Sequence, residues 1–193
     1  MANNIIAIGR QYGSGGREIG EALAKKLGVK CYDKELITIS AQKSGMCKEL
    51  FEDMDEKPIK AMYYMEVAPF AQAQYPINHQ LFLAQMNVIR EIAQRESCVF
   101  IGRCADYVLA EHENCHSVFV HAPFADRVKR AMERTGLEER KAEKLVRKID
   151  REREAYYDFY TSKLWGAADT YDLSLNSSAF GTQKCVDIIA GIL

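Results

Sequence analysis

The sequence lacks long apolar runs and any excess of charge, and each of these absences excludes a class of protein. No apolar run approaches the length of about 18 residues that a membrane-spanning helix needs. No basic segment leads into an apolar stretch at the N-terminus, so we expect neither secretion nor membrane insertion. With 26 basic and 27 acidic residues, the net charge of −1 gives no overall attraction for nucleic acid or for an acidic membrane.

Paired cysteines are also missing. The six cysteines are scattered, with no C-x-x-C and no zinc-like spacing to the four histidines: Cys31, Cys47, Cys98, Cys104, Cys115 and Cys185. We therefore expect a reduced, cytoplasmic protein, and we assign no metal-ligating residue. A length of 193 residues suits one well-buried core, so a single domain over residues 1–193 is the default expectation.

The most informative stretch is IIAIGRQYGSGGREIGEALAKKL, residues 5–27. Residues 5–8 form a short, mainly β-branched apolar run that is typical of a buried strand in a parallel sheet. A glycine-rich turn follows, and Ile19, Leu23 and Leu27 then recur every four residues, as on one face of a helix. Unpaired main-chain amides and the helix dipole favour an anion at such a helix start, so the turn predicts a phosphate site.

Two interpretations of this turn remain open on the residues alone. Gly9, Gly13 and Gly15 fit the G-x-x-x-G-x-G turn of short-chain dehydrogenases, in which Asp33 would hold an adenosine ribose. However, none of the ten tyrosines has a lysine four residues later, as the catalytic pair of those enzymes requires.

The second interpretation is a divergent phosphate loop similar to that of the nucleoside monophosphate kinases. Gly13-Ser14-Gly15 then matches their Gly-Ser-Gly, while Gly16 falls where the loop lysine should be. Glu18 replaces the hydroxyl residue that would hold Mg²⁺, and Arg17 or Arg10 would supply the missing positive charge.

The rest of the chain alternates strand-like and helical patterns. We predict further strands at residues 29–32, 98–101, 116–121 and 171–175, and helices at 124–134, 137–165 and 184–193. Residues 34–94 are helical in character, interrupted by Pro58, Pro69 and Pro76. This alternation predicts an α/β fold with a parallel sheet and ligands at the carboxyl ends of its strands.

Several ordered blocks resemble the cytidylate kinase-like family, a divergent branch of the P-loop nucleoside monophosphate kinases. They are the first stretch above, CYDKELI, VFIGRCADYVL, SVFVHAPFADRVKR, KIDREREAYYDFYTSKLW and YDLSLNSS. The resemblance implies a P-loop NTPase-type three-layer fold with a parallel sheet of about five strands. It further implies a core (1–33, 96–136, 166–193), a helical acceptor-binding insertion (34–95) and an arginine-rich lid (137–165).

The resemblance also implies where an acceptor would bind. Gly102-Arg103 resembles a G-R-D segment whose arginine contacts the acceptor monophosphate, although Cys104 stands at the aspartate position. Asp106 is the substitute that we expect for that aspartate. Asp33 matches an aspartate that lies near the acceptor nucleotide.

The remaining site residues are assigned by the same resemblance. Asp150-Arg151-Glu152-Arg153 is similar to a D-x-x-R lid signature, with Arg147 one turn before it, so Arg17, Arg103, Arg147, Asp150, Arg151 and Arg153 are the expected catalytic set. Arg127, Arg130 and Arg134 share one helical face toward the donor. The expected phosphate and nucleotide contacts are Arg10, Gly13, Ser14, Gly15, Gly16, Arg17, Glu18, Arg130, Arg134 and Asn176.

The implied activity is transfer of the γ-phosphoryl group of ATP, with Mg²⁺, to a nucleoside monophosphate or similar small phosphorylated acceptor. The alternative is a nucleotide-binding regulatory protein of the same fold without turnover, followed by a dehydrogenase that uses NAD(P). We expect no nucleic-acid or membrane partner. The oligomeric state stays open, with a homodimer as one arrangement.

Overall fold

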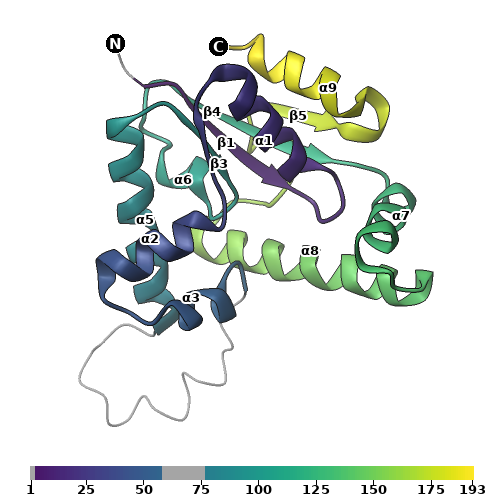
Figure 1. Ribbon diagram of the computed structural model, residues 1–193, viewed down its shortest axis with the longest axis horizontal. Helices are drawn as coiled ribbons and strands as arrows, with labels where there is room; N and C mark the ends of the chain where they lie inside the picture. The colour runs from purple at the N-terminus through teal and green to yellow at the C-terminus, as the bar shows by residue number, and fades with distance from the viewer. Residues whose placement is uncertain (1–2, 58–76) are drawn as a thin grey trace.

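The computed structural model describes residues 3–57 and 77–193, and these form an α/β fold around one parallel sheet (Figure 1). The strands are β1 (Ile5–Arg10), β2 (Lys30–Tyr32), β3 (Cys98–Ile101), β4 (Cys115–His121) and β5 (Leu173–Asn176). The helices are α1 (Gly16–Leu27), α2 (Glu35–Ser44), α3 (Lys48–Met54), α5 (Ile77–Arg95), α6 (Ala105–Val108), α7 (Phe124–Thr135), α8 (Glu139–Thr161) and α9 (Ser177–Ala190).

The order of the five strands is β2-β3-β1-β4-β5, and every neighbouring pair is parallel. β1 lies at the centre, and the chain builds the sheet outward on both of its sides. In such a sheet, ligands bind beyond the carboxyl ends of the strands where the order reverses, which here is the end of β1. The dinucleotide-binding fold of dehydrogenases has β2 rather than β3 beside β1, so the strand order disfavours the dehydrogenase interpretation.

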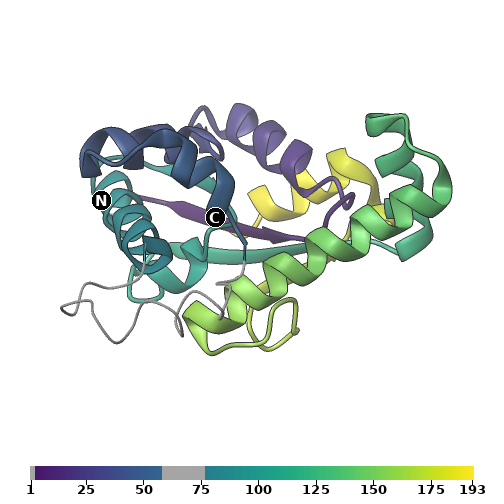
Figure 2. The same ribbon diagram turned by 90° about the horizontal axis from the view of Figure 1, so that it is seen from below.

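Alternate residues of the central strands bury two cores, because successive side chains of a strand point to opposite faces. Ile6 and Ile8 of β1 pack with α1 and α9, whereas Ile5 and Ala7 pack with α2, α5 and α6. Figures 1 and 2 show the resulting layers, with α1 and α9 on one side of the sheet and the long α8 on the other. The predicted three-layer P-loop fold with five parallel strands is confirmed.

Most predicted elements agree with the structure to within two residues. β3 spans the predicted 98–101, and α7 extends the predicted 124–134 by one residue. Three elements differ more, and the first is α8 (Glu139–Thr161), which ends four residues before the predicted 165. α9 begins at Ser177 rather than at 184, because the Asn176 side chain accepts hydrogen bonds from the amides of Ser178 and Ala179 and starts the helix there. The four-residue α6 was not predicted.

The predicted insertion is helical where the structure describes it, in α2, α3 and α5. Pro58, Pro69 and Pro76, which we expected to interrupt it, lie outside the described residues. The division of the chain into core, insertion and lid stays a prediction. Within the described residues, no helix combines the length and the apolar character needed to cross a membrane.

Candidate functional site

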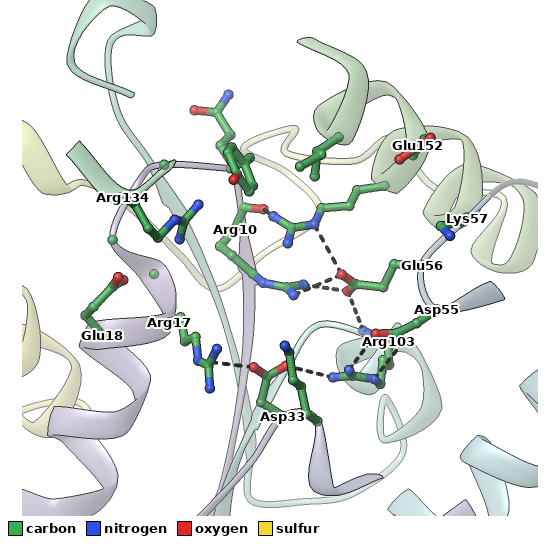
Figure 3. Close-up of a pocket in the computed structure, with 18 residues that line it drawn as sticks. Arg10, Arg17, Glu18, Asp33, Asp55, Glu56, Lys57, Arg103, Arg134 and Glu152 are labelled. Atoms are coloured by element: carbon green, nitrogen blue, oxygen red, sulfur yellow. Dashed lines mark hydrogen bonds and ion pairs between the residues drawn. The ribbon is translucent and has the colours of Figure 1, made fainter. Parts of the chain in front are cut away.

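A cavity of about 520 Å³ opens at the carboxyl end of β1. Side chains from the glycine turn, the end of β2, the end of α3, the turn after β3 and α8 meet there (Figure 3). The lining residues are Arg10, Gln11, Tyr12, Gly13, Gly15, Gly16, Arg17, Glu18, Asp33, Lys34, Asp55, Glu56, Lys57, Arg103, Arg134, Ile149, Glu152 and Arg153. The cavity therefore stands where the strand order locates a ligand.

The glycine turn forms the wall of the cavity at the start of α1. Gly13 and Gly15 have φ angles of 77° and 79°, a left-handed conformation that glycine adopts without steric cost. Gly16 begins α1, and a Cβ there would fall 2.6 Å from the Cβ of Arg10. Glycine at these positions thus lets the backbone turn sharply and directs the free amides of the first turn of α1 at the cavity.

Side chains hold the glycine turn in place through hydrogen bonds to its carbonyl groups. The Ser14 hydroxyl donates to the Gln11 carbonyl at 2.8 Å, and the Ser177 hydroxyl donates to the Ser14 carbonyl at 2.5 Å. Arg130 donates to the Gly13 carbonyl at 3.2 Å. These bonds engage the carbonyls of Gln11, Gly13 and Ser14, and the main-chain amides at the start of α1 suit an anion.

Asp150 connects α8 to this turn. Its carboxylate accepts a hydrogen bond from the Tyr12 amide at 2.8 Å and forms an ion pair with Arg127. Asp150 does not line the cavity, so the structure presents it as the residue that positions α8 against the turn.

The guanidinium groups of two arginines from different segments converge on one carboxylate that lines the cavity. Arg10 donates to Glu56 through both terminal nitrogens, at 2.5 and 2.9 Å, and Arg153 donates at 3.1 Å. Burial raises the pKa of Glu56, but the charges of Arg10 and Arg153 outweigh burial and hold that pKa below its ordinary value. Burial and the charge of Arg10 lower the pKa of Arg153 to about 10, so Arg153 stays charged at neutral pH.

Arg103 is held by two further carboxylates. It is 2 % exposed, and its guanidinium donates to Asp55 at 3.0 and 2.8 Å and to Asp33 at 3.0 Å. Burial lowers the pKa of Arg103, but Asp55, Glu56 and Asp33 together raise it above its ordinary value. Asp33 also lies 3.3 Å from Arg17, so it bridges the first turn of α1 and the turn after β3 (Figure 3).

Eight of the expected site residues other than Arg103 and Asp33 line the cavity: Arg10, Gly13, Gly15, Gly16, Arg17, Glu18, Arg134 and Arg153. Arg134 lies over the Tyr12 ring, with its guanidinium carbon 4.5 Å from the ring centroid. These positions bring the phosphate loop, one residue of α7 and one of α8 to a single space.

Other expected residues have different surroundings. The Arg147 guanidinium stacks on the Phe124 ring at 4.1 Å, and the exposed Arg151 donates to the Arg147 carbonyl. Asn176 caps α9. Asp106 accepts a hydrogen bond from the Tyr157 hydroxyl at 2.5 Å rather than lining the cavity. Ser14, Gly102 and Arg130 support the turns around the cavity without lining it.

Asp55 and Glu56, which pair with Arg10, Arg103 and Arg153, were not predicted from the sequence. They follow α3 in a stretch, DMDEK, that has no recognisable motif. Their partners lie 46 to 97 residues away in the chain, so no local spacing could have indicated the contacts.

The carboxylates that line the cavity determine whether it could hold a Mg²⁺ ion. Within the described residues, no group of three or more His, Cys, Asp or Glu side chains could hold a metal ion by itself. Mg²⁺ at nucleotide sites commonly takes one or two carboxylates together with phosphate oxygens and water. Glu18 lines the cavity in the first turn of α1, and Glu152 lines it from α8, so the lining fits an ion that arrives with a nucleotide.

Comparison with known proteins identifies relatives of the chain. A search of curated proteins gives no significant match. Among solved structures, an uncharacterized protein from Eubacterium ventriosum ATCC 27560 is 29% identical, with a TM-score of 0.75 and 98% of each chain covered. Shikimate kinase from Bacteroides thetaiotaomicron is 16% identical (TM-score 0.58; 98% of this chain and 97% of that chain). A gluconokinase from Sinorhizobium meliloti 1021 is 14% identical (TM-score 0.52; 98% and 93%).

At these low identities the two kinases show the fold alone. The family comparison goes further, because the model of the cytidylate kinase-like family matches residues 5–179, nearly the whole chain. The match confirms the resemblance seen in the sequence blocks, and the chain belongs to the cytidylate kinase-like family.

Proposed function

We propose that this protein is a cytoplasmic ATP-dependent phosphotransferase that moves the γ-phosphoryl group to a small phosphorylated acceptor, such as a nucleoside monophosphate. Membership of the family supports a kinase-like function. The observation that carries the proposal is the cavity itself, in which the amides of the glycine turn and the guanidinium groups of Arg10, Arg17, Arg134 and Arg153 share one space.

In the proposed mechanism, the glycine turn holds the donor phosphates and α8 closes over them. An acceptor oxygen bonds to the γ-phosphorus while the bond to the ADP oxygen breaks, with no covalent protein intermediate. Arg17 and Arg153 neutralise charge that spreads over the transferred group. We propose that Glu18 would hold a Mg²⁺ ion that arrives with the nucleotide, and this ion would supply positive charge to neutralise the phosphates.

Asp33 and Arg103 form the acceptor side in this proposal. They lie at the ends of neighbouring strands β2 and β3, and Asp33 contacts both Arg103 and Arg17. An acceptor beside this pair would face the donor phosphates across Arg17. Arg103 is held by Asp55 in this structure, so its contact with an acceptor phosphate requires Asp55 to give way.

A regulatory protein that binds nucleotide without turnover is the second candidate. It is favoured by the absence of the loop lysine, since Gly16 stands in its place, and by Glu18 in place of the hydroxyl residue. The planar guanidinium group of Arg17 differs in geometry from the ammonium group of the missing lysine. This difference affects how well the loop could support turnover.

A coupled assay of ADP release, with ATP, Mg²⁺ and a panel of nucleoside monophosphates, separates the two candidates. We expect acceptor-dependent turnover that Arg17→Ala reduces by about 100-fold or more, because charge stabilisation at the transferred group is lost. Lys25→Ala removes an exposed cation from the same helix and serves as the matched control. Nucleotide binding without turnover across the panel would instead favour the regulatory protein.

A further inference from the structure

Glu56 is surrounded by donors as a bound anion would be. Its carboxylate accepts hydrogen bonds from both terminal nitrogens of Arg10, from Arg153 at 3.1 Å and from the main-chain amide of Arg103 at 3.1 Å. These donors come from the end of β1, from α8 and from the turn after β3. Two guanidinium groups and an oriented amide form the donor set that proteins use for phosphate oxygens.

The turn after β3 is shaped for this close approach. Gly102, Arg103 and Cys104 have φ angles of 72°, 55° and 54°, so three successive residues adopt a left-handed conformation that is unusual for the last two. A Cβ on Gly102 would overlap both the Arg10 guanidinium and the Glu56 carboxylate. The backbone therefore keeps open the space in which Glu56 lies and directs the Arg103 amide into it.

Asp55 repeats the arrangement on the next arginine. Its carboxylate takes two hydrogen bonds from Arg103, the buried residue whose third contact is Asp33. Both acids belong to the segment that ends α3, whereas all three arginines belong to other elements. One short acidic segment thus occupies three of the guanidinium groups that line the cavity.

We propose that Asp55 and Glu56 are internal ligands of an oxyanion subsite, and that a phosphate group of the acceptor binds there by displacing them. The inference deepens the proposed function and rests on it for the identity of the anion as an acceptor phosphate. In the absence of substrate, the two carboxylates keep the arginines in position and exclude weakly bound anions.

The exchange is physically reasonable on charge and on strain. A phosphate monoester brings three terminal oxygens and up to two negative charges, whereas Glu56 brings two oxygens and one charge. Glu56 also has a φ of 51°, a left-handed conformation that is strained for a non-glycine residue. Burial raises the pKa of Asp55 despite the opposing charge of Arg103, so the ionised form of Asp55 is not favoured by its surroundings.

Calorimetric titration of the full-length protein with inorganic phosphate and with pyrophosphate tests whether phosphate displaces the two carboxylates. Glu56→Gln keeps the shape of the side chain and removes its charge, so we expect it to bind these anions about tenfold more tightly than the wild type. Glu52→Gln is the matched control, because Glu52 is an exposed acid on α3 that pairs with Lys48. Equal or weaker binding by Glu56→Gln, or an equal gain in both variants, would overturn the proposal.

A folding defect in Glu56→Gln would leave the test decisive. If the variant is unfolded in phosphate-free buffer, millimolar phosphate or pyrophosphate should restore the folded signal by filling the subsite, and failure to do so refutes the exchange. The assay requires no turnover. Tighter anion binding in a protein that phosphorylates no acceptor would sustain the subsite and refute the kinase, and turnover with unchanged anion binding would do the reverse.

Discussion

At the scale of single residues, the conformation of the glycine turn requires residues that have no Cβ atom. Gly13 has a φ of 77° and also lies against the backbone of α7. A Cβ at this position would fall 2.6 Å from the Arg127 carbonyl oxygen. Gly45 has a φ of 69° but faces open space. The pair separates the cost of a left-handed conformation from the cost of a backbone clash.

We therefore expect Gly13→Ala to lower the free energy of unfolding by about 1–3 kcal/mol more than Gly45→Ala does. Both variants bear the conformational penalty, but Arg127 must move only in the first. Urea denaturation of the two variants and the wild type measures the difference. Equal losses of unfolding free energy in the two variants would show that the glycine turn accommodates the Cβ without a clash, which would contradict the prediction.

A second residue-scale expectation concerns Asp106. Burial raises its pKa above the ordinary value, and the hydrogen bond from Tyr157 only partly offsets this. A carboxyl whose pKa is higher in the folded state stabilises the protein below its unfolded-state pKa of about 3.9, and this contribution is lost as the pH rises through the folded-state value.

Asp106→Asn cannot ionise and still accepts from Tyr157, so its stability relative to the wild type should increase between about pH 4 and pH 7. Urea denaturation across that range tests the sign, with exposed Asp169→Asn as the control. A difference that stays constant with pH would contradict the shift. It would also reopen a role for Asp106 as an ionised acceptor contact.

At the scale of elements, α8 is linked to the phosphate loop by one carboxylate. Asp150 accepts a hydrogen bond from the Tyr12 amide and forms an ion pair with Arg127. Because Arg127 is only 7 % exposed, its charge is stabilised by Asp150 rather than by water. The same helix brings Arg153 to Glu56 one turn later. A change at Asp150 should thus reach the nucleotide site through the position of α8.

We expect Asp150→Asn to weaken ATP binding by about tenfold and to lower stability by about 1–3 kcal/mol, because a buried guanidinium loses its counter-charge. Glu154→Gln, an exposed acid on the same helix, is the control. Calorimetric titration with ATP and urea denaturation give the two readouts. Lost stability with unchanged ATP affinity would limit Asp150 to a structural role.

The elements were also the scale at which the sequence was most informative. β1, β3 and α7 followed from runs of apolar residues and from helical spacing, which are local signals. The start of α9 at Asn176 and the turn of Gly102, Arg103 and Cys104 were not predicted, because a side-chain cap and a left-handed turn leave little trace in periodicity. Asp55 and Glu56 were missed because only tertiary folding brings them to the arginines.

At the scale of the whole molecule, the sheet gathers residues that are distant in sequence at one edge. Arg10 ends β1, while Asp33 and Arg103 follow β2 and β3. These strands are neighbours in the sheet, so the three side chains meet at the cavity. Arg17 and Arg134 reach the same space from α1 and α7. The resemblance to the family anticipated these residues, but only the strand order explains why they converge.

The central claim is that the glycine turn and these arginines bind a polyphosphate, and calorimetric titration of ATP into three proteins tests it most directly. The wild type and Arg140→Ala, which removes an exposed arginine from α8, should bind one ATP with the same affinity. Arg153→Ala, which removes a cavity arginine from the same helix, should bind at least about tenfold more weakly. No binding of ATP by the wild type, or equal affinities in all three proteins, would contradict the claim.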